Sequence, residues 1–149
     1  MSDNYLRLIP YSPVFIPDKN AIDKAVFLLK EDFPYPDIVR VEISDSPLFI
    51  DQGANFERVV CPCCNETLDL EWWQNAMDNA FANRFQNLIV KVPCCGIETT
   101  LNDLIYDWPT GFALFLIEIS NPGMDVTDAR LNQLETILGS PLRKIRAHY

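Results

Sequence analysis

Apolar and polar positions near the start of the chain predict a strand, a helix and a second strand. Residues 5–10 and 38–44 alternate between apolar and polar side chains, which is typical of strands with one buried face. Between them, residues 19–31 carry apolar side chains at helical spacing. Asp18 is a favourable N-cap for this helix, and Pro34 prevents its continuation.

The last third of the chain predicts the same order. Residues 112–119 are almost all apolar, as expected for a strand with neighbours on both sides. A helix follows, with Asp125 and Asp128 as a capping pair at its start and Gly139 as its stop. Residues 142–148 alternate again and predict a final strand with basic side chains on one face.

Two strand–helix–strand units separated by a long middle segment resemble a ferredoxin-like sandwich, which belongs to the α+β class. In that fold the first and third strands are central, and both helices cover one face of the sheet. The charged second and fourth strands suit the edges. We therefore expect residues 1–44 and 111–149 to form a split core, with residues 45–110 as an inserted lobe that can cover the other sheet face.

All five cysteines lie in the middle segment, in two short groups. The first group is Cys61-Pro62-Cys63-Cys64, and the second is Pro93-Cys94-Cys95-Gly96. Strand-like runs precede both groups, and the arrangement resembles the two cysteine knuckles of a zinc ribbon. Zn²⁺ binds four thiolates tetrahedrally at about 2.3 Å. We predict a structural Zn²⁺ bound by Cys61, Cys64, Cys94 and Cys95.

The second group departs from a regular knuckle. Val92 stands where a cysteine would be expected, and Cys94 and Cys95 are adjacent. Cys63 is the spare thiol and can replace one of the four proposed ligands. A structural disulfide, a redox-active Cys61–Cys64 pair and buried thiols without a metal remain alternatives. Four sulfurs would fill the coordination sphere, so a zinc ion here is structural rather than catalytic.

A helix predicted over residues 68–83 separates the two cysteine groups. Its apolar face is formed by Leu70, Trp73, Met77, Ala80 and Phe81. This face suits packing in a core. Trp72 falls on another face, where an exposed tryptophan can anchor an interface.

The segment 101–112 is the second candidate for a site. It contains two carboxylates, Asp103 and Asp107, close to the aromatic residues Tyr106 and Trp108. These side chains can line a small-molecule pocket. They can equally belong to a connector that packs the inserted lobe onto the sheet.

The string that starts at the second cysteine group resembles a family of small uncharacterised bacterial proteins. It runs through Leu101-Asn102-Asp103-Leu104 and Tyr106-Asp107-Trp108-Pro109 to Gly111-Phe112, and the resemblance covers roughly residues 55–122. That family has no established activity, so the resemblance implies no ligand or reaction.

Charge along the chain narrows the classes of partner. The formal net charge is −9, and residues 45–110 alone carry a net −7 because ten acidic residues face only three basic ones. Binding to duplex nucleic acid depends on Lys and Arg at phosphates, so it is disfavoured. The acidic segment is either a solvated surface or a patch that contacts a basic protein partner.

The remaining signals favour a cytoplasmic binding protein over an enzyme. The first residues lack the features of a signal peptide, and no apolar run reaches the roughly 18–20 residues of a membrane helix. We find no glycine-rich phosphate loop and no Ser/His/Asp set, and the single histidine, His148, has no evident partner. The alternatives are an enzyme or small-molecule binder that uses residues 101–112, and a thiol redox protein.

Overall fold

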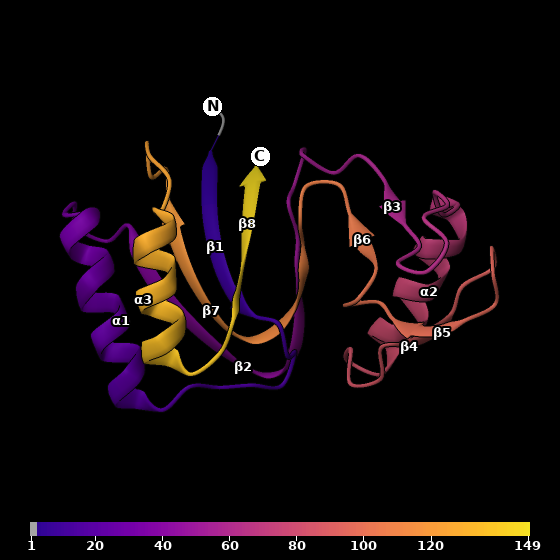
Figure 1. Ribbon diagram of the computed structural model, residues 1–149, viewed down its shortest axis with the longest axis horizontal. Coiled ribbons are helices and arrows are strands. Elements are labelled where there is room, and N and C mark those ends of the chain that lie inside the picture. The colour runs from indigo at the N-terminus through magenta and orange to yellow at the C-terminus, as the bar shows by residue number, and fades with distance from the viewer. Residues whose placement is uncertain (1–2) are drawn as a thin grey trace.

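Four long strands form one antiparallel sheet in the computed structural model, which describes residues 3–149 (Figure 1). The strands are β1 (Asn4–Pro10), β2 (Val39–Ile50), β7 (Gly111–Ser120) and β8 (Leu142–His148). Their order is β2-β7-β1-β8, so the central and edge positions agree with those predicted from the sequence. Within residues 3–149, no helix has the length and apolar character needed to cross a bilayer.

Two helices, α1 (Lys19–Asp32) and α3 (Asp128–Leu138), cover one face of the sheet. The register pairs Leu8 of β1 with Ile117 of β7, and both side chains belong to the cluster that includes Leu29 and Leu134 of the helices. All four side chains are fully buried. Burying each contributes about 1.5–3 kcal/mol, so this contact holds the helices on the sheet.

The ends of the helices agree with the sequence prediction at two positions and differ at one. The Asp18 carboxylate accepts a hydrogen bond from the start of α1, and Gly139 ends α3 in the left-handed conformation, with φ of 79°. The predicted capping role of Asp125 is wrong. Thr127 caps α3, because its hydroxyl accepts from the backbone N–H of Arg130.

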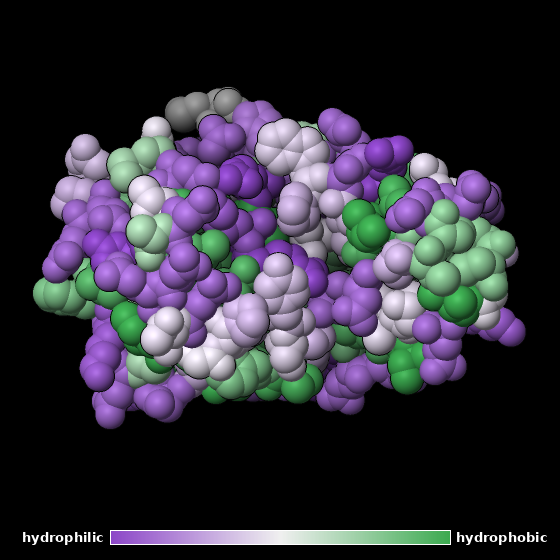
Figure 2. All heavy atoms as spheres, in the orientation of Figure 1, coloured by the Kyte–Doolittle hydropathy of each residue, from purple (hydrophilic) through white to green (hydrophobic). Residues whose placement is uncertain are grey.

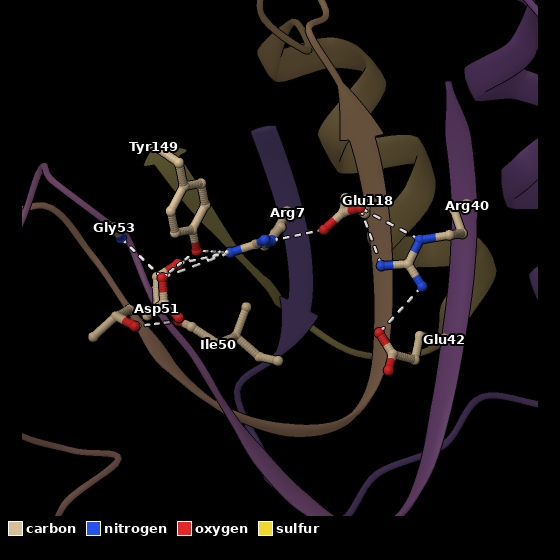
Figure 3. A network of polar contacts seen from close by, with 9 residues as sticks. Arg7, Arg40, Glu42, Ile50, Asp51, Gly53, Glu118 and Tyr149 are labelled. Atoms are coloured by element: carbon tan, nitrogen blue, oxygen red, sulfur yellow. Dashed lines mark hydrogen bonds and ion pairs between the residues drawn. The ribbon is translucent and has the colours of Figure 1, made fainter. Parts of the chain in front are cut away.

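The sheet face opposite the helices carries a row of charged side chains (Figure 3). Glu118 of β7 is buried between Arg7 of β1 and Arg40 of β2, with nitrogen–oxygen distances of 2.9 and 3.0 Å. Arg7 also donates to the Tyr149 hydroxyl and to the backbone carbonyl of Asp51. The Arg40 side chain is 52% exposed, so this part of the face is not covered by the inserted lobe.

The middle segment forms a separate lobe around the helix α2 (Leu70–Ala82). Its strands are short: β3 (Val59–Val60), β4 (Ile89–Lys91), β5 (Glu98–Thr100) and β6 (Ile105–Tyr106). They pair only as β3–β6 and β4–β5. Trp73 and Met77 of α2 are buried in the lobe, whereas Leu70 and Phe81 are 48% and 69% exposed, so the buried face of α2 is narrower than predicted.

The lobe joins the sheet at the far ends of β2 and β7. Strand β2 continues past a register shift between Ile43 and Leu48, beyond the strand end predicted at residue 44. Its last residues pair with the first residues of β7, where Phe49 lies opposite Phe112. The Phe49 ring packs against Trp73 of the lobe at 6.0 Å between centroids.

A buried amide, Asn102, fixes the junction between the lobe and the sheet. Its Nδ2 donates to the Tyr11 carbonyl at 2.8 Å, and its Oδ1 accepts from the Phe112 N–H at 2.9 Å. Arg143 of β8 donates to the backbone carbonyls of Asn102 and Thr110. Segment 101–112 therefore packs the lobe onto the sheet, which is one of the two roles expected for it.

Candidate metal centre

The first cysteine group forms a tight turn after β3. The Cys61 N–H donates to the Glu66 carbonyl at 2.9 Å, and the Asn65 N–H donates back to the Cys61 carbonyl at 3.0 Å. Asn65 takes the left-handed conformation, with φ of 62°. Asparagine tolerates this region better than most residues. The turn presents the Cys61 and Cys64 thiols on one side.

The second group forms a turn with the same backbone hydrogen bonds. The Val92 N–H donates to the Ile97 carbonyl, and the Gly96 N–H donates to the Val92 carbonyl, both at 3.0 Å. Gly96 takes the left-handed position with φ of 72°, as Asn65 does in the first turn. Residues 61–66 and 92–97 are therefore equivalent, position by position.

Together the two turns gather four thiols. The sulfur atoms of Cys61, Cys64, Cys94 and Cys95 all lie within 4.8 Å of one another. The Cys61–Cys95 sulfurs are 3.8 Å apart, and the Cys64–Cys94 sulfurs are 3.3 Å apart. Four thiolates around one Zn²⁺ at about 2.3 Å would be separated by about 3.8 Å. The donor set and its spacing therefore fit a single metal ion, as the sequence predicts.

The same distances argue against the disulfide alternative. All five cysteines are free thiols in this structure. The closest sulfur–sulfur distance given above is well beyond the roughly 2.05 Å of a covalent bond. The cluster is therefore a group of potential metal ligands rather than a pair of cross-links.

The equivalence of the turns explains the irregular second group. Val92 corresponds to Cys61, Cys94 to Cys63, and Cys95 to Cys64 in the two hydrogen-bonded turns. The first turn contributes its first and fourth positions to the cluster, and the second contributes its third and fourth. Val92 is buried in the lobe core instead. Cys63 is exposed and lies outside the cluster of four.

The backbone of the first turn favours one thiolate. The N–H of Cys64, assisted by that of Cys63, lowers the pKa of Cys61 to about 7. Desolvation and the neighbouring Cys64 sulfur raise the pKa of Cys94. Thiolates so close together repel each other, and a divalent cation removes that repulsion. The cluster thus has chemistry suited to metal binding and a closed set of four sulfurs.

The aromatic and acidic candidates do not form a second site together. Tyr106 is buried in the lobe core, where its hydroxyl donates to the Leu101 carbonyl and accepts from the Trp73 indole. Burial raises the pKa of Tyr106. Its polar atom is therefore committed to the lobe core.

The other candidate side chains lie apart. Asp107 forms an ion pair with Arg58, and Asp103 accepts from the Thr100 hydroxyl. Asp103 and Tyr106 line one hollow, Trp108 lines another, and Trp72 lines a third beside α2. Trp108 is 42% exposed and takes a positive φ of 58°. The five residues do not converge on one pocket.

Asn102 is the residue of this segment that sequence reasoning missed. It looks like an ordinary loop asparagine, and only the fold places it between Tyr11, Phe112 and Arg143. Its place beside Leu101 in a segment of mixed polar and apolar residues does not distinguish a buried amide from an exposed one.

The comparisons with known proteins identify no relative of this chain. No protein-family model, curated protein or solved structure matches the chain. The metal-binding potential of the cluster therefore rests on its own geometry, and the zinc-ribbon and bacterial-family resemblances stay predictions.

Proposed function

We propose that this chain is a non-enzymatic interaction protein. In this proposal, Cys61, Cys64, Cys94 and Cys95 hold a structural Zn²⁺ that makes the inserted lobe rigid. The acidic surface of the lobe then contacts a basic protein partner.

The convergence of four thiols from two separate turns is the observation that carries the proposal. Cys64 and Cys94 are 30 positions apart in the sequence, yet their sulfurs are 3.3 Å apart. A soft, tetrahedral donor set of this kind suits Zn²⁺. When bound, the ion would supply a cross-link between the turns, and four sulfur ligands would leave no position for substrate.

The surface of the lobe supports a basic partner. Seven of its acidic residues are exposed, and none of them belongs to an ion pair within residues 3–149. They are Glu57, Glu66, Asp69, Glu71, Asp78, Glu98 and Asp103. Figure 2 shows hydrophilic residues beside apolar ones on the lobe, at the right of the view. Exposed charges of one sign guide a partner of the opposite sign.

We further infer that the sheet and its two helices are a ferredoxin-like sandwich and that the lobe is a zinc-ribbon variant. The order β2-β7-β1-β8, antiparallel throughout, supports the first inference. The two equivalent turns support the second. The sandwich would then serve as the scaffold that presents the lobe.

A comparison of charge variants in the metal-loaded protein tests the partner. Glu66→Gln, Glu71→Gln, Asp78→Asn and Glu98→Gln together remove four exposed negative charges from the lobe. Asp23→Asn and Asp37→Asn on the core serve as controls, because both are exposed and distant in sequence from the lobe.

We expect the native protein to retain a basic protein from a cell extract at low salt and to release it at high salt. The core controls should behave in the same way, and the lobe variant should lose the partner while keeping its metal. Binding that is unaffected by both the lobe variant and the salt concentration would contradict the proposal.

A further inference from the structure

The outer edge of β8 is partly open. Leu142, Arg146 and His148 direct their backbone groups away from the neighbouring strand β1, because all three bond to atoms outside the sheet. The acceptors and donors are Glu135 for Leu142, Asn55 for Arg146, and Gln52 and Ala54 for His148. In an antiparallel strand, every second residue directs its backbone N–H and C=O to the same side. The backbone groups of Lys144 therefore also point away from β1.

Within residues 3–149, no residue forms hydrogen bonds with the backbone groups in the middle of this edge. Among the hydrogen bonds of residues 3–149, none involves the N–H or C=O of Lys144 or the N–H of Arg146. The Lys144 side chain does not cover them. It turns toward the segment before α3, where Nζ lies 3.2 Å from an Asp125 carboxylate oxygen and 3.3 Å from the Val126 carbonyl.

The open edge borders a cleft between β8 and the lobe connector. The cleft has a volume of about 520 Å³, and Arg143, Lys144 and Arg146 line it on the β8 side. Asp103, Ile105 and Pro109 line it on the connector side. The cleft therefore lies between the outer edge of β8 and the connector that carries β6. Its lining combines unpaired backbone groups, apolar side chains and three cations against the single carboxylate of Asp103. Two of these cations, Lys144 and Arg146, also pair with Asp125.

The other edge strand is protected in a different way. Strand β2 has a register shift between Ile43 and Leu48, and Pro47 lies within it. Both features interrupt pairing with a further strand. Strand β8 has neither between Leu142 and Arg146, because its register with β1 is continuous. The basic side chains were the only protection expected for β8.

We propose that the cleft beside β8 binds an extended acidic segment of a partner protein, which adds a short strand to the sheet. The segment would exchange hydrogen bonds with Lys144 and Arg146 and would place carboxylates near the three basic side chains. A second copy of β8 is a poor occupant, because it would bring the same three cations against each other. The unpaired backbone groups belong to β8, whereas the connector side of the cleft shares Asp103 with the acidic lobe surface.

The variant Lys144→Pro tests the edge directly, and Lys144→Ala is its control. Both variants lose the ion pair with Asp125, but only proline removes the outward N–H. The bonds from β8 to β1 are made by the alternate residues, so a folded Lys144→Pro protein is expected. Its fold is checked by its melting curve and by the amide spectrum of β1.

The probe is a displayed library of random octapeptides, selected on the native protein and counter-selected on Lys144→Pro. We expect recovered peptides to be rich in Asp and Glu and to bind the native and Lys144→Ala proteins at least about tenfold more tightly than Lys144→Pro. Binding should shift the amide resonances of Lys144 and Arg146 and slow exchange of the Lys144 amide in the native protein, a readout that needs no variant.

Four outcomes would overturn the proposal. The selection can yield no binder, or peptides that bind Lys144→Pro and Lys144→Ala equally. The shifted amides can map to another surface. A native dimer that Lys144→Pro abolishes would assign the edge to a second copy of this chain instead.

Discussion

The sheet core and the inserted lobe are stabilised in different ways. The core has strands of up to twelve residues and two capped helices around one buried cluster. The lobe has a single helix and strands of only two or three residues. It still buries an aromatic cluster around Trp73 and Phe85. Isolated two-stranded pairs are marginal in water, so the lobe is the region that gains most from a metal cross-link.

Metal removal by a chelator should give the largest difference in amide protection between the core and the lobe. We predict that metal removal lowers the amide protection of residues 59–106 by roughly a thousandfold, about 4 kcal/mol, and changes the central strands far less. The reason is that the cysteine turns lie in the lobe and the cluster around α1 and α3 does not need them. Hydrogen exchange followed by mass spectrometry measures both regions together. Equal loss of protection in both would contradict the division.

A rescue variant tests whether the two cysteine turns are equivalent. Cys94→Ser should lose the metal, because only three thiols of the cluster remain. Adding Val92→Cys should restore it, since residue 92 corresponds to Cys61 in the first turn. Metal content per chain is the measurement. Cys94→Ser combined with Val92→Ala is the control, and failure of Val92→Cys to restore more metal than this control would reject the equivalence.

The junction between the regions is the next test. Asn102→Ala leaves the Phe112 N–H and the Tyr11 carbonyl without their partner in a buried site. We expect a loss of about 2–4 kcal/mol, observed in chemical denaturation. Asn79→Ala on the exposed side of α2 should change stability by less than about 0.5 kcal/mol. An effect of Asn102→Ala as small as that of the control would show that the lobe is not held there.

The smallest expected loss of stability comes from removing Asp125, which pairs with Lys144 and Arg146 on the surface of the core. Desolvation raises the pKa of Asp125, but hydrogen bonds from Arg146 and Lys144 outweigh it and lower the pKa below its ordinary value. A lowered pKa stabilises the fold above the pKa of the unfolded chain, and this contribution disappears as the pH falls through the lower folded value.

Asp125→Asn should therefore cost less than about 1 kcal/mol at neutral pH, since the side chain is 48% exposed. The difference from the native protein should shrink as the pH falls through the lowered pKa of Asp125. Denaturation curves at several pH values measure it. A cost that persists at low pH would show that Asp125 acts by packing rather than by charge.

Local signals predicted much of the core. Helix α1 follows its Asp18 cap and helical spacing, and β7 follows its apolar run, because these features act within a few residues. Asp125 was assigned the wrong role because two residues near a helix start can both act as caps, and its ion pairs with β8 lie about twenty positions away. The row of Arg7, Glu118 and Arg40 depends on strand register, which the sequence alone does not provide.

The candidate site was predicted only in part, because some of its features are local in sequence and others depend on distant contacts. Cysteine spacing predicted the four thiols that the structure brings together and that could hold a metal ion. The hydrogen bonds that make Val92 equivalent to Cys61 were not evident, because they depend on the carbonyls of Glu66 and Ile97. The junction amide Asn102 depends on contacts with residues far away in the chain.

The most direct measurement of the central claim is the zinc content of the purified protein, determined by elemental analysis for the native chain and two serine variants. One zinc ion per chain is expected in the native protein and in Cys63→Ser, with little or none in Cys61→Ser. A native protein without metal, or one that keeps its full zinc content after loss of Cys61, would contradict the account.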